Sequence, residues 1–394
     1  IHERLVGSEM CIRDRCIIAR NYLPALNMIE LTFLEIIVIF IWVFVCRMMY
    51  RKFYPPRHLL LVYGYKTPTE FIDKINARKD KYIIADRIHV SEGEKALKEK
   101  ILQYDGVILC ETKAYIRNEL VKYCFEHSIR SYVVPKLSDI IILGAEPIHL
   151  FDTPLLLSRN QGLTGEDMIF KRLMDIIVSL IMIIIFSPFM ILIALAIKLY
   201  DRGPVFYKQD RLTLNGRVFK IMKFRSMRMD SEEHGAQLAR KHDDRITPVG
   251  RVIRATHLDE LPQLFNILKG DMSVVGPRPE RPEIAAQYRE TFPEFDYRLK
   301  MKAGLTGYAQ VYGKYNTTPR DKVKLDLTYY EQYSLWLDLK LILLTFKILF
   351  QKENTEGIDA NQTTAIREDK TKKTGIKHPH DEAEDAFYSV EEKK

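Results

Sequence analysis

The chain contains two long apolar segments, separated by stretches in which apolar and polar residues alternate. The first covers residues 32–49 and, as a helix over 30–50, is near the minimum length that crosses a bilayer. Basic residues follow it directly: Arg47, Arg51, Lys52 and Arg57. The sequence therefore predicts a membrane helix with its C-terminal side in the cytoplasm. A buried core helix is the alternative, although the charge of Glu35 argues against it.

The second segment, residues 176–197, has no charged residue and is long enough to span a membrane. Basic residues flank both of its ends: Lys171, Arg172, Lys198 and Arg202. Because both ends favour the cytoplasmic side, a straight spanning helix satisfies only one of them. Pro188 donates no amide hydrogen bond and crowds the carbonyl of Ile184. We predict a re-entrant helix over about 173–199 that breaks at Ser187-Pro188, where Ser187 or nearby protein satisfies the freed backbone groups. A kinked spanning helix is the alternative.

Between these segments, residues 57–157 alternate short branched apolar runs with amphipathic stretches. The runs at 59–63, 82–85, 106–110 and 131–134 predict strands, and the stretches at 67–77, 92–102 and 114–127 predict helices. This alternation predicts a small Rossmann-like α/β domain with a parallel sheet and crossover helices. The segment after the first strand, Val62-Tyr63-Gly64-Tyr65-Lys66-Thr67, lacks the glycine-rich phosphate loop. A structural or regulatory role is therefore favoured over nucleotide binding.

The region after the second apolar segment is basic and punctuated by glycine and proline, with short helix signals at 259–269 and 281–290. Residues 335–350 interleave large apolar side chains with charges, which is typical of a helix in the membrane interface or of a core helix. We predict a mixed α+β domain over 168–350. The tail, 351–394, has few large apolar residues and is predicted to be disordered.

The start of the chain needs separate treatment. Residues 1–15 fit neither a signal peptide nor a folded element, and they are similar to read-through of a cloning or sequencing adapter. We exclude them from fold reasoning. Because the chain starts at Ile1, we expect the natural N-terminus, with further membrane helices, to be missing.

The charge and the cysteine content of the chain indicate which molecules it binds and in which compartment it lies. The 394 residues carry a formal net charge of +8, and the cations gather around the apolar segments and after residue 200. This pattern suits anionic lipid head groups or phosphorylated substrates. No nucleic-acid-binding motif accompanies the charge, so nucleic acid is not an expected partner. The 5 cysteines are odd in number and no pair has metal-ligand spacing, which indicates a reducing, cytosolic compartment.

Adjacent carboxylates at Asp259 and Glu260 lie directly before Leu261-Pro262. Because proline suits the first turn of a helix, the pair is predicted at a helix start, where the dipole favours anions and a bound phosphate. Consecutive helical residues point in different directions. One carboxylate could therefore attack phosphorus while the other helps to bind a metal. Taken alone, a capping Asp with an acidic first turn is the more common explanation of such a pair.

Several cations lie in the same region. Two prolines fix the backbone of Pro277-Arg278-Pro279, so the guanidinium can hold a phosphate through both of its arms. Lys223 and Arg225 follow an alternating stretch that predicts a strand, and Arg254 shortly precedes the carboxylates. The turn Gly304-Leu305-Thr306-Gly307 either faces a phosphate with its amides or packs closely. Each of these signals is weak by itself.

Together the motifs form a specific order. They are Lys171-Arg172…Asp175, Ser187-Pro188, Gly203-Pro204-Val205-Phe206, Lys223-Phe224-Arg225-Ser226-Met227, Leu258-Asp259-Glu260-Leu261-Pro262-Gln263, Gly276-Pro277-Arg278-Pro279 and Gly304-Leu305-Thr306-Gly307. Over about 170–350 this order closely resembles the bacterial sugar transferases, which are monotopic polyprenyl-phosphate glycosyl-1-phosphate transferases. The preceding helix and α/β unit are similar to the large subtype that begins exopolysaccharide assembly, where several membrane helices precede the α/β unit.

The resemblance implies transfer of a hexose-1-phosphate from a UDP-sugar to polyprenyl (undecaprenyl) phosphate, with release of UMP, at the cytoplasmic face of a bacterial cell membrane. Asp259 is the implied nucleophile of a ping-pong reaction through a covalent aspartyl-phosphosugar, and Glu260 would help with Mg²⁺ and positioning. The candidate phosphate-binding or substrate-binding residues are Arg254, Arg278, Lys223 and Arg225. Tyr308 stands where many relatives have Trp, which should not affect the chemistry.

Two other classes of protein stay open at this stage. A non-catalytic membrane component of a polysaccharide complex would use the α/β unit to bind a nucleotide and regulate partners. A polyprenyl-phosphate transferase of the many-helix type needs roughly ten spans, whereas this sequence shows two candidates at most. The sequence does not identify the sugar. It also leaves polysaccharide-assembly proteins and a second copy of the chain open as partners.

Overall fold

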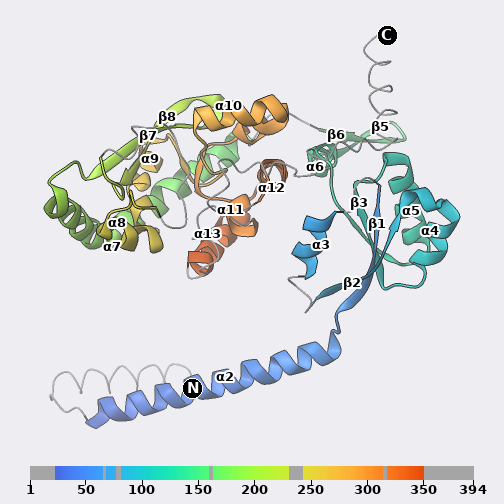
Figure 1. Ribbon diagram of the computed structural model, residues 1–394, viewed down its shortest axis with the longest axis horizontal. Coiled ribbons are helices and arrows are strands. Elements are labelled where there is room, and N and C mark those ends of the chain that lie inside the picture. The colour runs from blue at the N-terminus through green and yellow to red at the C-terminus, as the bar shows by residue number, and fades with distance from the viewer. Residues whose placement is uncertain are drawn as a thin grey trace. The chain divides into compact units, whose positions relative to one another are not determined.

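The computed structural model describes residues 23–64, 68–76, 81–158, 163–229, 243–313 and 317–349. It divides into two compact units, of which the first ends at Val134 and the second begins at Pro135 (Figure 1). The predicted adapter-like segment, 1–15, and the predicted disordered tail, 351–394, lie outside the described residues.

A long helix, α2 (Leu23–Phe53), leads into the first unit (Figure 1). From Asn27 onward its side chains are exposed, including bulky ones such as Phe40 and Trp42. Exposure of this much apolar surface is costly in water, and lipid would remove that cost. In the described part of the chain, α2 and α7 (Gly165–Asp201) are the two helices long and apolar enough to cross a membrane.

The first unit is built on a four-stranded sheet in which every strand is parallel to its neighbours. The strand order is β2 (Tyr82–His89), β1 (Arg57–Tyr63), β3 (Gly106–Cys110) and β4 (Arg130–Val133). Crossover helices connect them: α3 (Thr69–Asn76), α4 (Glu94–Ile101) with the short turn η1 (Val90–Glu92), and α5 (Ala114–Glu126). The prediction of a parallel sheet with crossover helices is confirmed.

The central strands explain why this sheet needs helices on both faces. Leu60 and Val62 of β1 join one apolar cluster with residues of α4 and α5. Leu59 and Leu61 join another, against which residues of α3 pack. Because successive side chains of a strand point to opposite faces, an unbroken apolar run buries both faces of the sheet.

The second unit begins with α6 (Leu137–Leu143) and an antiparallel hairpin of β5 (Glu146–Leu150) and β6 (Thr153–Leu157). The predicted α/β domain, over 57–157, includes this segment. In the structure, Ile140 instead joins an apolar cluster with Phe295, Val323 and Leu327 of the second unit. Burial of this helix face against later helices groups the segment with the second unit.

The second apolar segment forms a single helix, α7 (Gly165–Asp201), which continues through Pro188. The Ser187 hydroxyl donates to the carbonyl of Ile184 at 3.0 Å. That carbonyl is the one for which Pro188 has no amide hydrogen. Ser187 satisfies this carbonyl, as predicted. The predicted break at Ser187-Pro188 is wrong, because the hydroxyl replaces the missing amide donor and the helix continues. Re-entry into the membrane stays a prediction.

The remaining elements enclose the second unit's core. The strands are β7 (Phe206–Leu212) and β8 (Val218–Phe224), which pair antiparallel around the turn η2 (Leu214–Gly216), and β9 (Ser273–Val275) and β10 (Gly304–Thr306), which pair parallel. The helices are α8 (Pro248–Ala255), η3 (Leu258–Glu260), α9 (Gln263–Lys269), α10 (Pro282–Thr291), η4 (Pro293–Lys300), α11 (Tyr308–Tyr312), α12 (Pro319–Glu331) and α13 (Leu335–Leu349).

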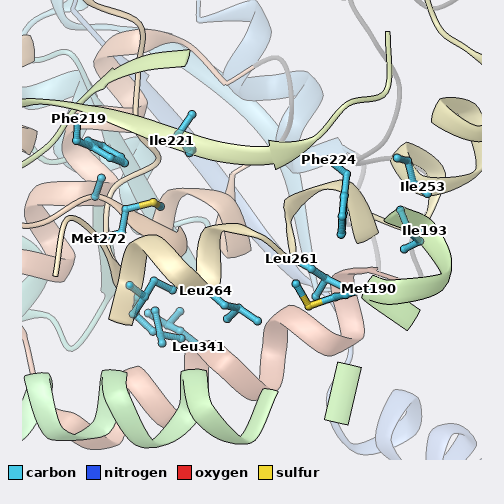
Figure 2. Close-up of a cluster of buried hydrophobic side chains, with 14 of the residues drawn as sticks. Met190, Ile193, Phe219, Ile221, Phe224, Ile253, Leu261, Leu264, Met272 and Leu341 are labelled. Carbon is cyan, nitrogen blue, oxygen red and sulfur yellow. The ribbon is translucent and has the colours of Figure 1, made fainter. Parts of the chain in front are cut away.

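The core of this unit joins the apolar helix to the rest of the fold. Figure 2 shows Met190 and Ile193 of α7 in one cluster with Leu261, Leu264 and Leu341. The opposite side of α7 stays exposed, through Ile177, Leu180, Ile181, Ile184, Ile185, Phe189, Ile191, Leu192, Leu195 and Leu199. Helix α13 is similarly two-sided, because Leu341 is fully buried while Trp336 and Leu343 are exposed. The sequence predicted either a core helix or a helix in the membrane interface. In the structure, one face of α13 packs in the core and the other face is exposed.

Candidate active site

A sharp reversal between α8 and α9 carries the two adjacent carboxylates. Helix α8 starts at Thr247, whose hydroxyl accepts from the amide of Gly250 at 2.9 Å, and Pro248 takes the first helical position. A Cβ on Gly250 would lie 1.9 Å from the carbonyl oxygen of Ser226, so only glycine fits there. His257, with a φ of 56°, ends the helix in the left-handed region. The chain then makes one 3₁₀ turn and enters α9.

Asp259 and Glu260 lie in that 3₁₀ turn, directly before α9. The prediction that the pair lies at a helix start is confirmed. The two side chains have different surroundings, as the divergence of consecutive residues predicts. Glu260 is paired with cations, whereas Asp259 is not.

Glu260 is held by two cations from separate parts of the chain. Its Oε1 accepts from Lys223 Nζ at 2.6 Å and from Arg278 Nη2 at 3.1 Å. Burial alone would raise the pKa of this carboxyl, but the charges of Lys223 and Arg278 outweigh burial and hold the pKa well below its usual range. Glu260 is therefore a fixed negative charge at neutral pH.

Asp259 is buried, with 9% of its surface exposed, and its carboxylate forms no hydrogen bond or ion pair with any residue in the described ranges. Burial raises the pKa of Asp259, and the charge of Glu260 raises it further, against the opposing charges of Lys223, Arg254 and His257. Burial and a neighbouring anion therefore make this carboxylate more basic than an ordinary Asp.

Arg254 and Arg278 lie on either side of the pair. Arg254 occupies the last turn of α8, is half-buried, and contributes a positive potential at Asp259. Its guanidinium forms no hydrogen bond within the part of the chain that the structure describes, so its side-chain donors are available to an anion. Arg278 is exposed and uses one arm for Glu260. We call Asp259, Glu260, Lys223, Arg254 and Arg278 the carboxylate cluster.

Close packing of glycines fixes the strand that leads to Arg278. A Cβ on Gly304 would lie 2.1 Å from the amide nitrogen of Gly276, and one on Gly307 would lie 2.1 Å from the Gly276 oxygen. The backbones of the β9 end and the β10 turn therefore meet without side chains between them. Of the two alternatives for the Gly304–Gly307 turn, the structure favours close packing.

Arg225 does not join the carboxylate cluster. Its buried guanidinium pairs with Asp201, the last residue of α7, and lies against Gly203. The structure therefore places Arg225 where it ties the end of α7 to the end of β8. Its predicted role in substrate binding has no support from this geometry.

Polar residues before the apolar run tie α7 to the rest of the second unit. Arg172 donates to the carbonyls of Ile267 and Leu268 at 2.6 Å each, at the end of α9. Asp175 accepts from Ser273 Oγ at 2.9 Å and from the Val274 amide at 2.8 Å. Asp175 thus holds the strand that leads to Arg278, a role that no local pattern indicated.

Lys171 belongs to a second group of buried charges. Its Nζ donates to Asp338 Oδ2 at 2.7 Å and to the Tyr329 hydroxyl at 3.1 Å, and Tyr329 also donates to Asp338. The three side chains come from α7, α12 and α13. We call Lys171, Tyr329 and Asp338 the helix-anchoring cluster. It fastens the start of the apolar helix to the two C-terminal helices.

The residues present can be tested for their fit to the expected Mg²⁺. In the described ranges, no group of three or more His, Cys, Asp or Glu could hold a metal ion. Mg²⁺, however, commonly uses one or two carboxylates and completes its shell with water and substrate phosphates. The unpaired carboxylate of Asp259 beside Glu260 fits that mode of binding.

The carboxylate cluster joins two carboxylates and three cations, and comparison with known proteins assigns the family of the chain. The model of the bacterial sugar transferase family matches residues 166–352. A relative from Caulobacter vibrioides, a UDP-glucose:undecaprenyl-phosphate glucose-1-phosphate transferase, is 40% identical over 189 residues, which are 47% of this chain and 71% of that protein. The chain belongs to the bacterial sugar transferase family.

Two further relatives act on different sugars by name. A UDP-glucose:undecaprenyl-phosphate glucose-1-phosphate transferase of Klebsiella pneumoniae is 43% identical over 209 residues, 52% of this chain and 43% of that protein. A UDP-N-acetylgalactosamine-undecaprenyl-phosphate N-acetylgalactosaminephosphotransferase of Aeromonas hydrophila is 44% identical over 182 residues, 45% of this chain and 43% of that protein. The chain thus matches less than half the length of these two relatives.

Proposed function

We propose that the protein transfers a hexose-1-phosphate from a UDP-sugar to polyprenyl phosphate, releasing UMP, as the first membrane step in assembly of a bacterial surface polysaccharide. The observation that carries the proposal is the contrast between two adjacent carboxylates. Glu260 is fixed by two cations, while Asp259 keeps a carboxylate without a partner in the described residues. Cations beside an unpaired, basic carboxylate suit nucleophilic attack on a phosphate ester.

In the first half of the proposed reaction, an oxygen of Asp259 attacks the phosphorus that bears the sugar. A bond forms between that oxygen and phosphorus, and the bond from phosphorus to the bridging oxygen of the diphosphate breaks. The electron pair stays on the bridging oxygen, so UMP leaves. Arg254 and Arg278 are placed to bind the phosphate oxygens whose charge changes in this step.

In the second half, an oxygen of polyprenyl phosphate attacks the same phosphorus. The bond between Asp259 and phosphorus breaks, the lipid diphosphate-sugar leaves, and the Asp259 carboxylate is regenerated. Glu260 stays ionised throughout because Lys223 and Arg278 hold its pKa low. A Mg²⁺ ion held by Asp259 and Glu260 would neutralise phosphate charge when bound.

The apolar helix supports a location at the cytoplasmic face of the bacterial cell membrane. Near its start, Arg172 binds the end of α9, and at its end Asp201 pairs with Arg225. Both ends of α7 therefore contact the same folded unit, which supports a helix whose two ends lie on the same side of the membrane. We infer that α7 enters and leaves the membrane on one side, and that the exposed faces of α7 and α13 contact lipid.

This topology can be tested with single cysteines at Met168 and Arg202, which are exposed positions at the two ends of α7. In inverted membrane vesicles, a membrane-impermeant thiol reagent should label both positions from the cytoplasmic side. The native Cys11, Cys16 and Cys46 are replaced by Ser, and the other two native cysteines are buried. Labelling of the two positions from opposite sides would establish a spanning helix.

The chemistry is tested by incubating the purified protein with donor alone. A panel of radiolabelled UDP-sugars, with polyprenyl phosphate added, first identifies the sugar that enters the lipid fraction. Rapid quenching after addition of that donor without acceptor should then show release of UMP and a mass gain of one phosphosugar on Asp259. Asp259→Asn, which can still bind donor, should show neither. Active protein without that mass gain would contradict the covalent mechanism.

A further inference from the structure

The backbone around Arg278 is held at every carbonyl over residues 277–280. The amide of Gly304 donates to the oxygen of Pro277 at 2.9 Å, and the amide of Leu212 donates to the oxygen of Glu280 at 3.0 Å. These two bonds fasten the ends of the segment to β10 and β7. Two prolines leave the segment with few amides of its own, so its shape depends on donors from elsewhere.

The two central carbonyls are held by guanidinium groups. Arg298 Nη2 donates to the oxygen of Arg278 at 3.1 Å, and Arg211 Nη1 donates to the oxygen of Pro279 at 3.0 Å. Arg211 also donates to Gln209 at 2.8 Å. Hydrogen bonds from a charged donor are stronger than those between neutral groups. The main chain of Arg278 is therefore fixed by a charged side chain of η4.

Arg298 forms a buried ion pair with Asp326. Only 3% of its surface is exposed, and Asp326 of α12 is 2% exposed. Arg298 Nε lies 3.0 Å and Nη2 2.9 Å from the same Asp326 oxygen, while Nη1 lies 3.6 Å from Glu280. Burying an ion pair gives little net stability compared with apolar packing. A role in orienting the segment it touches explains the pair better than stability does.

We propose that Arg298, anchored by Asp326, is a positioning residue for the transferase reaction and sets the main chain from which Arg278 reaches Glu260 and the substrate phosphate. This inference rests on the proposed function. Arg298 is not a catalytic residue, because its guanidinium contacts the carbonyl of Arg278 and buried carboxylates. It acts through Arg278, whose guanidinium binds Glu260 at 3.1 Å.

Arg298→Lys is the first test, because lysine keeps the charge opposite Asp326. Its compact ammonium cannot reproduce the planar fork that reaches both Asp326 and the Arg278 carbonyl. We expect kcat/KM for the UDP-sugar to fall about 10- to 100-fold, since small misplacement of a binding group is costly. Arg211→Lys, which loosens the neighbouring carbonyl from a different strand, is a second variant should Arg298→Lys fail to fold, and a smaller fall in the same direction is expected.

Arg289→Lys is the matched control. Arg289 also pairs with a carboxylate in this unit, with Nε 2.8 Å from Asp296, but it does not contact residues 277–280. Its kcat/KM should stay within about two-fold of the parent protein. An equal loss in Arg289→Lys and Arg298→Lys would overturn the proposal.

A double-mutant cycle separates positioning from general stability. If Arg298 acts through Arg278, then Arg298→Lys should lower activity little further in the Arg278→Gln background, while the losses in thermal stability add. If Arg298→Lys lowers activity by the same factor in both backgrounds, the proposal is wrong. Full activity of Asp259→Asn would instead refute the proposed function, so the two failures are distinguishable.

Discussion

The carboxylate cluster and the helix-anchoring cluster both bury charge in the second unit, yet they pair it differently. In the helix-anchoring cluster, Asp338 accepts from both Lys171 and Tyr329, and its side chain is fully buried. In the carboxylate cluster, Glu260 forms ion pairs with two cations, whereas Asp259 forms none with the described residues. A desolvated charge is stable only when it is paired. The unpaired carboxylate therefore reduces stability in a way that a functional site explains.

The largest expected effect separates these two clusters by activity. Asp259→Asn should lower kcat at least about 1,000-fold, because it removes the proposed nucleophile. Its thermal stability should not fall, because no described residue pairs with the carboxylate that is lost and burial disfavours its charge. The measurements are initial rates of lipid-linked sugar formation and thermal unfolding in the same lipid nanodiscs. If Asp259→Asn keeps both its activity and its stability, the proposed difference between the carboxylate cluster and the helix-anchoring cluster is wrong.

Lys171→Met should have the opposite profile. It leaves Asp338 buried without its cation, and breaking one side of a buried pair typically costs about 3–5 kcal/mol of unfolding free energy. Activity per folded molecule should fall far less than in Asp259→Asn, because Lys171 contacts no member of the carboxylate cluster. Denaturant unfolding in detergent measures the loss. Asp338→Asn in the Lys171→Met background is the control and should recover part of the stability by removing the uncompensated charge.

The acid limb of the pH–rate profile sharpens the contrast within the carboxylate cluster. The nucleophile must be ionised, and burial together with Glu260 raises the pKa of Asp259 above its ordinary value. Activity should therefore fall, as pH is lowered, at a higher pH than an ordinary Asp would give. Glu260→Gln removes the neighbouring negative charge, so the acid limb of its residual activity should move to lower pH. A limb that moves to higher pH would show that Glu260 does not raise the pKa of Asp259.

The smallest expected effect concerns the hydroxyl that completes the helix-anchoring cluster. Tyr329→Phe removes a donor to Asp338 and an acceptor for Lys171, and we expect a loss of about 1–3 kcal/mol in unfolding free energy. The Lys171–Asp338 ion pair remains, so this loss should be smaller than that of Lys171→Met. Equal losses of unfolding free energy in the two variants would indicate that the Tyr329 hydroxyl, and not the ion pair, stabilises the cluster.

Local patterns predicted the first unit closely because each strand and helix there has its own signal. Residues 106–110 match β3, and residues 114–127 match α5 within one residue. The boundary between units was harder to predict. Burial of Ile140 of α6 beside Phe295 and Leu327 decides to which unit this helix belongs.

The candidate site was predicted in part. Asp259, Glu260, Lys223, Arg254 and Arg278 lie together as their shared chemistry suggested. Arg225 has the same charge as Lys223, two residues earlier. It nevertheless pairs with Asp201, the last residue of α7, and not with the carboxylate cluster. A motif gives the residue types at a site, and it does not show which anion each cation meets.

The sequence by itself determined the strands and helices of the first unit, the two apolar helices and the order of the charged motifs, because these depend on neighbours along the chain. Only the tertiary structure decided that Glu260 is paired while Asp259 is not, and that Arg298 reaches the carbonyl of Arg278. Ion pairs of this kind form between side chains far apart in sequence. Their geometry and desolvation exist only once the chain has folded around them.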